Sequence, residues 1–233
     1  MLVYNSKISE YEIRKILKCF AIDLNATQSS ELLGINRNTI NRFYNHFRYL
    51  IYDEQIRQFW LLLWWEVELD EMYYWWRRRK WFAGNKRGRW TMKQPVFWVY
   101  ERWGRIVTQL IPNCTKKILQ EIIKEHVDRH SNVYTDWWKW YDWLIDLWYK
   151  KHYRVNHWAH EFSKWWWIHI NWLEAFWSFT KRRLNKFNGV KDMLALHMKE
   201  CERRYLKTNE QMIDELIKLL KSYSKLLQSI NRK

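Results

Sequence analysis

Apolar residues recur every three to four positions through the first fifty residues of the chain. In residues 8–23 this spacing predicts a helix. Thr27 can cap a short second helix that ends before Gly34, and Asn36 can cap a third helix. Helix, short helix, glycine turn and helix form the layout of a helix-turn-helix domain, which we predict for residues 1–50. A plain three-helix bundle is the alternative.

A period of two replaces the helical period in residues 66–74. Apolar and acidic residues alternate here, so that Glu66, Glu68 and Asp70 share one face of a predicted strand. A carboxylate near the end of a strand is costly to bury without a cation, which makes Asp70 a first candidate metal ligand. An edge strand with a solvated acidic face would show the same pattern.

Strands and helices alternate through the rest of the chain. Strands are predicted at residues 96–100, 105–111, 132–136 and 153–156, and helices at 115–127, 141–147, 171–187, 190–205 and 209–230. The last helix has an amphipathic stripe that must pack on this chain or on a partner copy. An antiparallel meander followed by strands joined through crossovers is the element order of the ribonuclease H-like fold.

The predicted fold class is therefore α/β, a ribonuclease H-like mixed sheet flanked by helices and preceded by an all-α helix-turn-helix domain. We place the domain boundaries as follows: residues 1–50 for the helix-turn-helix domain, 51–65 for an apolar linker, 66–206 for the ribonuclease H-like domain, and 207–233 for a C-terminal amphipathic helix.

Charge indicates the class of partner. Lys and Arg outnumber Asp and Glu by 41 to 25, a net charge of +16, which points to nucleic acid before a membrane surface. The longest apolar run, residues 59–65, is too short to span a bilayer, and the first residues lack the apolar segment of a secretion signal. Cys19, Cys114 and Cys201 are far apart, as in reduced cysteines of a cytoplasmic protein. We expect a cytoplasmic bacterial protein with no membrane partner.

Two stretches carry candidate DNA contacts. The start of the last helix of a helix-turn-helix faces the major groove, where Arg and Asn contact G and A bidentately, and this predicts Arg37, Asn38, Asn41 and Arg42 as base readers. A basic loop follows the first strand, and its simplest role is phosphate contact. The residues of this loop are Arg77, Arg78, Arg79, Lys80, Lys86, Arg87 and Arg89. A solvated charge run is the alternative for the loop.

Three carboxylates fit one metal site: Asp70, Asp136 at the end of the fourth strand, and Glu174 on the helix that Asn171 opens. Ligands of α/β sheets gather at the C-terminal ends of strands. Mg²⁺ or Mn²⁺ takes such oxygen ligands, and two ions about 3.5–4 Å apart can activate a water or a 3′-hydroxyl. A three-acid spacing is by itself a weak signal in a chain with 25 acidic residues.

The local contexts of these acids strengthen that signal. They are Glu-Val-Glu-Leu-Asp-Glu-Met-Tyr-Tyr at 66–74, the basic loop, Val-Tyr-Thr-Asp at 133–136, Tyr-Arg-Val-Asn-His at 153–157, and Asn-Trp-Leu-Glu-Ala-Phe-Trp at 171–177 followed by Lys-Arg-Arg-Leu at 181–184. From about residue 8 to about residue 206 the chain resembles bacterial insertion-sequence transposases of the DDE type, in particular the small IS1595-like group.

This resemblance implies a DNA transposase that cuts and joins strands with Mg²⁺ or Mn²⁺, two ions held by Asp70, Asp136 and Glu174 as the catalytic triad. Its partners would be double-stranded DNA, both the terminal inverted repeats and the target, and we expect a homodimer on DNA. Lys181 lies two turns beyond Glu174 on the same helix side and could hold a DNA phosphate.

Other interpretations stay open. One is a helix-turn-helix regulator with an inactive core, and another is a ribonuclease H-like nuclease that cuts DNA without joining it. His157, His160 and His169 could suggest a metal site, but no third soft ligand accompanies the His-x-x-His spacing, and hydrogen-bonded or surface histidines are commoner.

Tryptophan is in excess, with 20 Trp against 5 Gly. Base stacking on single-stranded DNA would explain a platform of indoles, but these are scattered through predicted strands, turns and helix starts. We hypothesise that the gene comes from a lineage that reads the codon UGA as glycine. Trp138 and Trp177 fit as true aromatics, and the natural protein would have glycine at Trp75, Trp76, Trp90, Trp98, Trp140 and Trp172.

Overall fold

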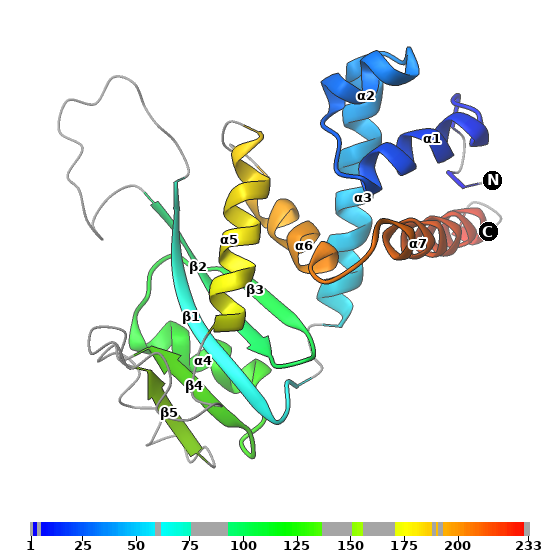
Figure 1. Ribbon diagram of the computed structural model, residues 1–233. Coiled ribbons are helices and arrows are strands. Elements are labelled where there is room, and N and C mark those ends of the chain that lie inside the picture. The colour runs from blue at the N-terminus through cyan, green and yellow to red at the C-terminus, as the bar shows by residue number, and fades with distance from the viewer. Residues whose placement is uncertain are drawn as a thin grey trace. The chain divides into compact units, whose positions relative to one another are not determined.

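The computed structural model describes residues 2–3, 6–58, 62–75, 93–136, 151–155, 171–187, 190 and 193–230 (Figure 1). The chain divides into two compact units. Residues 1–55 and 199–233 form the first, called here the helical unit, and residues 56–198 form the second, the sheet unit. No helix in the described ranges is long and apolar enough to cross a membrane.

The helical unit begins with the predicted order of helices, α1 (Glu10–Ala21), α2 (Ala26–Leu33) and α3 (Arg37–Arg57). Asn25 caps α2, its side chain accepting from the Gln28 N–H at 2.9 Å, so the predicted cap at Thr27 is wrong by two residues. Gly34 then takes the left-handed conformation, with φ of 66°. The Asn36 side chain accepts from the Asn38 N–H at 2.8 Å at the start of α3, as predicted.

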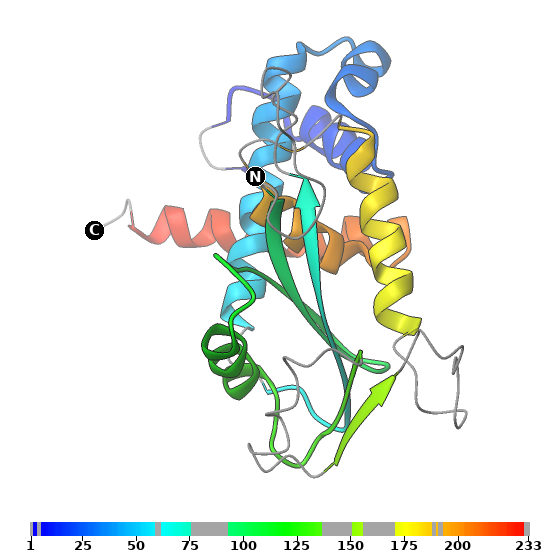
Figure 2. The same ribbon diagram turned by 90° about the vertical axis from the view of Figure 1, so that its left-hand side faces the viewer.

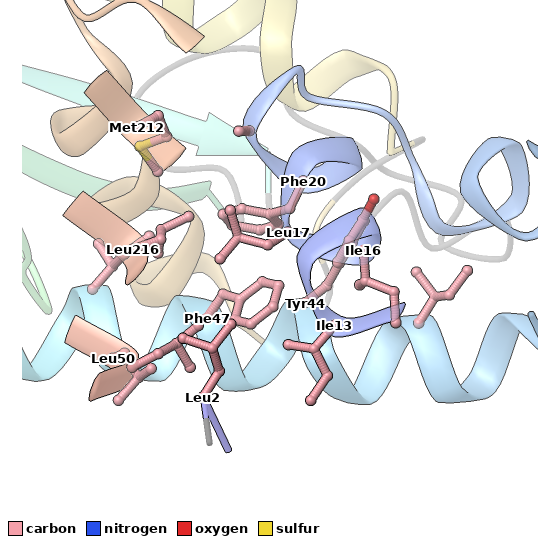
Figure 3. Close-up of a cluster of buried hydrophobic side chains, with 14 of the residues drawn as sticks. Leu2, Ile13, Ile16, Leu17, Phe20, Tyr44, Phe47, Leu50, Met212 and Leu216 are labelled. Carbon is pink, nitrogen blue, oxygen red and sulfur yellow. The ribbon is translucent and has the colours of Figure 1, made fainter. Parts of the chain in front are cut away.

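The core of this unit is closed by the C-terminal helix α7 (Asn209–Ile230). Phe20 of α1 packs edge-on against Tyr44 and Phe47 of α3, with ring centroids 5.1 and 5.4 Å apart. Met212 and Leu216 of α7 lie in the same cluster and are fully buried (Figure 3). The amphipathic stripe of the last helix therefore packs on its own chain, and the structure groups residues 207–233 with the N-terminal helices.

Two ends of predicted elements change. Helix α3 continues to Arg57, so residues 51–57 are helical where we predicted a linker, because Ile51 extends the buried stripe of the helix by another turn. Helix α6 (Leu194–Arg204) begins four residues later than the helix predicted from residue 190. The predicted helix at residues 141–147 lies outside the described ranges.

The sheet unit contains five strands in the order β3-β2-β1-β4-β5. The strands β1 (Glu66–Trp75), β2 (Lys93–Glu101) and β3 (Ile106–Leu110) are antiparallel neighbours, whereas β4 (Asn132–Asp136) and β5 (Lys151–Val155) run parallel to β1. An antiparallel meander extended by two parallel crossover strands is the ribonuclease H-like arrangement, and the predicted fold class is confirmed.

Helices lie on both faces of this sheet (Figure 2). The helix α4 (Lys116–His126) packs its buried Leu119 and Ile123 against Val67 and Leu69 of β1. The helix α5 (Asn171–Asn185) covers the opposite face, where Trp98 of β2 contacts its aromatic residues. Because strand side chains alternate between faces, the acidic face of β1 is the one that α5 covers.

Candidate active site and DNA-binding residues

Asp70 and Asp136 stand on neighbouring strands. Strands β1 and β4 pair in parallel, with Leu69 opposite Thr135. One residue further along each strand come Asp70 and Asp136, and paired strands lie only about 4.8 Å apart. Strand pairing therefore places two of the three predicted acids side by side at the C-terminal end of β4.

Glu174 reaches this place from α5, where it lies in the first helical turn. The pKa of Asp70 is raised well above its usual value, first by burial and then by the negative charges of Glu71, Asp136 and Glu174. The Glu71 N–H, which donates to Asp70 Oδ1 at 2.8 Å, opposes this shift. The structure thus brings all three predicted acids onto one face of the sheet, close enough to feel one another's charge.

The types of residue at this site suit a divalent cation, but their present spacing does not. Carboxylate oxygens are the ligands that Mg²⁺ prefers, and a cation would relieve the mutual repulsion that raises the pKa of Asp70. Among the described residues, however, no three His, Cys, Asp or Glu side chains lie close enough together to hold one ion. The three acids share one face of the sheet, and a shared ion would require their carboxylates to move closer together.

Glu68 is a buried carboxylate that sequence reasoning left without a role. It is inaccessible to solvent, and its Oε1 accepts from Arg102 Nε at 2.8 Å while its Oε2 accepts from the backbone N–H of Leu173 at 3.1 Å. Burial raises its pKa to about 7, although Arg102 and the Leu173 N–H act in the opposite direction. The sequence does contain an acid within a strand and an arginine just after the end of the neighbouring strand, and this combination could have indicated the ion pair.

Arg102 completes this buried group from the turn between β2 and β3. Its Nη1 lies 2.9 Å from Glu66 Oε2, and its guanidinium lies 3.9 Å from the centroid of the Tyr134 ring. Burial, followed by the charge of Glu66, raises the pKa of Tyr134 to about 12. Arg102 thus joins side chains of β1 and β4 through one guanidinium.

The four predicted base readers lie on the first turns of α3 and are all exposed: Arg37, Asn38, Asn41 and Arg42. The apolar residues between and after them, such as Ile40 and Tyr44, are buried in the helical unit. Residues 37 and 41 are one helical turn apart, as are residues 38 and 42, so the four side chains cover adjoining parts of one surface. Their exposure agrees with the prediction, and base contact stays a prediction.

Lys181 is exposed on α5, seven residues after Glu174, and its Nζ lies 4.9 Å from the centroid of the Trp177 ring. The basic loop, represented by Arg77 to Lys80 and by Lys86, Arg87 and Arg89, lies outside the described residues. The same is true of His157, His160 and His169.

Residues 63–206 match the model of the ISXO2-like transposase domain, a match that covers β1 to β5, α4, α5 and α6. The chain belongs to this transposase family. The predicted resemblance to IS1595-like transposases is thereby confirmed. All three predicted acids, together with Glu68 and Arg102, lie inside the matched region.

Two known proteins resemble this transposase. It is 37% identical over 122 residues to an uncharacterized transposase-like protein of Haemophilus influenzae, an alignment that covers 52% of this chain and 94% of that protein. The crystal structure of the Mos1 strand transfer complex aligns with 97% of this chain and 80% of the matched chain, at 12% identity and a TM-score of 0.34. A likeness as weak as the second is no evidence of shared function.

Proposed function

We propose that this transposase binds double-stranded DNA at the terminal inverted repeats of its insertion sequence, cleaves the strand ends, and joins the freed 3′-hydroxyl to target DNA. One observation supports the proposal: Asp70, Asp136 and Glu174 lie on one face of the sheet within the region that matches the family. A cluster of acids that repel one another is typical of a catalytic site rather than of a structural core.

Asp70 and Asp136 would hold the divalent metal, Mg²⁺ or Mn²⁺, and Glu174 would add the third carboxylate. Bound at this place, two such ions supply an activated hydroxyl and stabilise the leaving oxygen of an in-line displacement. Burial and the neighbouring negative charges raise the pKa of Asp70. A bound cation would offset those charges, so the carboxyl would lose its proton more readily. Metal binding is therefore expected to release a proton from this carboxyl.

The remaining predicted residues would position DNA. Arg37, Asn38, Asn41 and Arg42 would read base edges in the terminal repeats, since they are exposed at the start of α3. Lys181 and the basic loop would contact phosphates, which orient a duplex without reading it. An element with two inverted ends presents the same site twice, which suits a homodimer with twofold symmetry.

The decisive experiment replaces each acid by its amide: Asp70→Asn, Asp136→Asn and Glu174→Gln. Each variant should lose Mg²⁺-dependent cleavage of a duplex that carries the element's end, while binding of that duplex persists. Glu121→Gln is the matched control, because it removes the same charge from an exposed position on α4, on the other face of the sheet. A variant that still cleaves would show that the residue it replaces is not part of the active site.

The same assay separates the alternatives. A wild-type protein that binds the repeats but leaves them intact with Mg²⁺ and with Mn²⁺ would be a regulator with an inactive core. A protein that cleaves the end and gives no strand-transfer product would be a nuclease. The proposed transposase gives both products, and both disappear in EDTA.

A further inference from the structure

Glu68 connects the two elements that carry the predicted acids. It stands two residues before Asp70 on the same face of β1, and it accepts from the N–H of Leu173, the residue before Glu174. An unpaired N–H in the first turn of a helix attracts a carboxylate, so this contact suits the start of α5. One buried side chain thus connects the helix of Glu174 to the strand of Asp70.

Burial of an ionised glutamate requires compensation, and Arg102 provides it through Nε at 2.8 Å. Arg102 in turn is fixed by Glu66 and by the face of Tyr134. These contacts leave Glu68 little freedom, and any displacement of it would be passed to the first turn of α5.

We propose that Glu68 is a positioning residue that holds the first turn of α5 against β1 and so presents Glu174 to Asp70 and Asp136. This rests on the proposed function, because positioning has meaning only if the three acids act together. Among the described residues no three acidic side chains lie within reach of one ion. The distances between Asp70, Asp136 and Glu174 therefore matter for metal binding, and a positioning residue would act on these distances.

A purely structural role is the alternative, and the chain contains a matched control for it. Glu200 is also inaccessible to solvent, and it accepts from Arg48 at 2.8 Å and from Arg204 at 2.8 Å. It lies in the helical unit, outside the sheet that carries the predicted acids. Removing either charge disturbs a buried ion pair, but only Glu68 touches the helix of Glu174.

The test compares Glu68→Ala, Glu68→Gln and Glu200→Gln in the full-length protein, all assayed well below their melting temperatures. We expect Glu68→Ala to lower kcat for cleavage about a hundredfold and to raise the Mg²⁺ concentration at half-maximal rate, with KM for DNA unchanged. Glu68→Gln keeps one acceptor oxygen, so its kcat should fall only about tenfold. Glu200→Gln should lower the melting temperature and leave kcat unchanged.

A loss of melting temperature in the Glu68 variants with kcat and Mg²⁺ dependence unchanged would overturn the positioning role. If Glu68→Ala does not fold, Glu68→Gln alone decides the question by the same two readouts. A wild-type protein without cleavage activity would instead refute the proposed function, so the two failures are distinguishable.

A second inference comes from the backbone. Trp65 has φ of 70° and Trp103 has φ of 64°, a conformation that strains a bulky L-residue and suits glycine. Their side chains are 81% and 84% exposed, so little packing offsets the strain. In the helical unit Asp23, Gly34 and Leu206 take the same conformation, with φ of 63°, 66° and 61°.

The distribution of tryptophan points the same way. All 20 tryptophans lie between Trp60 and Trp177, and none occurs in residues 1–55 or 199–233. We propose that the native protein has glycine at positions 65 and 103, because its gene uses UGA as a glycine codon and the present sequence reads UGA as tryptophan. Trp98 and Trp172 have ordinary strand and helix backbones, so Trp65 and Trp103 carry this inference.

Base stacking is the competing explanation. The Trp103 ring packs edge-on against Trp172, with centroids 4.9 Å apart, and Trp172 lies two residues before Glu174. The exposed Trp103, backed by the half-buried Trp172, could stack on an unpaired base near the cleaved end. Stacking explains exposure, but it does not explain a left-handed backbone at either residue.

The nucleotide sequence is the first test: codons 65 and 103 should be UGA and codon 177 should be UGG. Peptides of the protein purified from its own host should then have the mass for glycine at positions 65 and 103. UGG codons at these positions, or tryptophan in the native peptides, would overturn the inference.

Variants provide the second test. Trp65→Gly and Trp103→Gly should each raise the melting temperature by roughly 2–4 °C, since the left-handed strain disappears. Leu206→Gly calibrates this gain, because Leu206 has φ of 61°. Trp177→Gly should lower the melting temperature, because Trp177 of α5 stacks on Trp98. If Trp103→Gly fails to stabilise the protein and weakens DNA binding, base stacking is correct.

Discussion

The two units bury a glutamate in different surroundings. In the helical unit Glu200 accepts from two arginines, so that positive charge flanks the carboxylate. In the sheet unit Glu68 accepts from Arg102 and from a backbone N–H, and burial, with a smaller contribution from the charge of Glu174, raises its pKa to about 7. The first arrangement neutralises a charge, and the second gathers acid where a cation could bind. This contrast separates a fully paired carboxylate from one that lies beside the predicted catalytic acids.

The units also differ in how they make left-handed turns. The helical unit has Asp23, Gly34 and Leu206 in this conformation, whereas in the sheet unit Trp65 and Trp103 take it. Two tryptophans of the sheet unit thus take a conformation that suits glycine.

The largest expected change in stability comes from the closing helix of the helical unit. Leu216→Ala should lower the free energy of unfolding by about 2–5 kcal/mol, because Leu216 is fully buried in the cluster of Phe20 and Met212. Far-UV circular dichroism during chemical denaturation measures the loss. Leu226→Ala, on the exposed side of the same helix, is the control and should change little.

All tryptophans lie outside the helical unit, so their fluorescence follows the sheet unit separately. Leu216→Ala should move the fluorescence transition less than the circular dichroism transition. Equal shifts of the two transitions would mean that the two units unfold together and do not have separate stabilities.

The next effect concerns recognition. Arg42→Ala should weaken binding to the terminal repeat by about 1–3 kcal/mol and leave binding to unrelated DNA nearly unchanged, since a base contact is lost. Competition binding at fixed salt measures the difference. Arg57→Ala, an exposed arginine at the other end of α3, is the matched control. Equal losses on both DNAs would make Arg42 a phosphate contact.

The units should respond oppositely to pH in metal-free buffer. The folded pKa of Glu68 is raised to about 7 from 4.5, so the folded state holds this proton more tightly than the unfolded state. The stability that it contributes is full below about pH 4.5 and is lost as pH rises through 7. Tryptophan fluorescence melts between pH 5 and 8 should show this loss, and Glu68→Gln should flatten the profile.

His46 of the helical unit has the reverse sign. Burial lowers its pKa below 6.5, so the stability from neutral His46 is present above pH 6.5 and is lost as pH falls through the folded pKa. Circular dichroism melts of His46→Gln should depend less on pH than those of the wild type. A helical unit that gains stability on acidification through this residue would contradict the burial of His46.

The smallest effect is expected at Lys181. Lys181→Ala should reduce the slope of log affinity against log salt by about one unit, because one phosphate contact is lost, and it should do so on any DNA. Lys218→Ala, which removes an exposed lysine from α7, provides the comparison. An unchanged slope for Lys181→Ala would leave this lysine with only its contact to the Trp177 ring.

Local pattern was enough to predict most elements and the faces of β1. Helix α7 was predicted at its observed bounds, since its apolar spacing is regular throughout. The alternation in residues 66–74 correctly placed Glu68 and Asp70 on one face, because successive side chains of a strand point to opposite sides. Element order then gave the sheet, since meanders and crossovers allow few topologies.

The sequence by itself thus determined which acids could share a site, through the strands and the helix that carry them. Only the tertiary structure decided that Glu68 is paired with Arg102 and touches the helix of Glu174, and that α7 completes the core beneath α1. A periodic pattern shows that a face will be buried, but the partner that buries it lies far along the chain. Residues 68 and 173, or 20 and 216, meet only when the chain has folded, and no local spacing records that meeting.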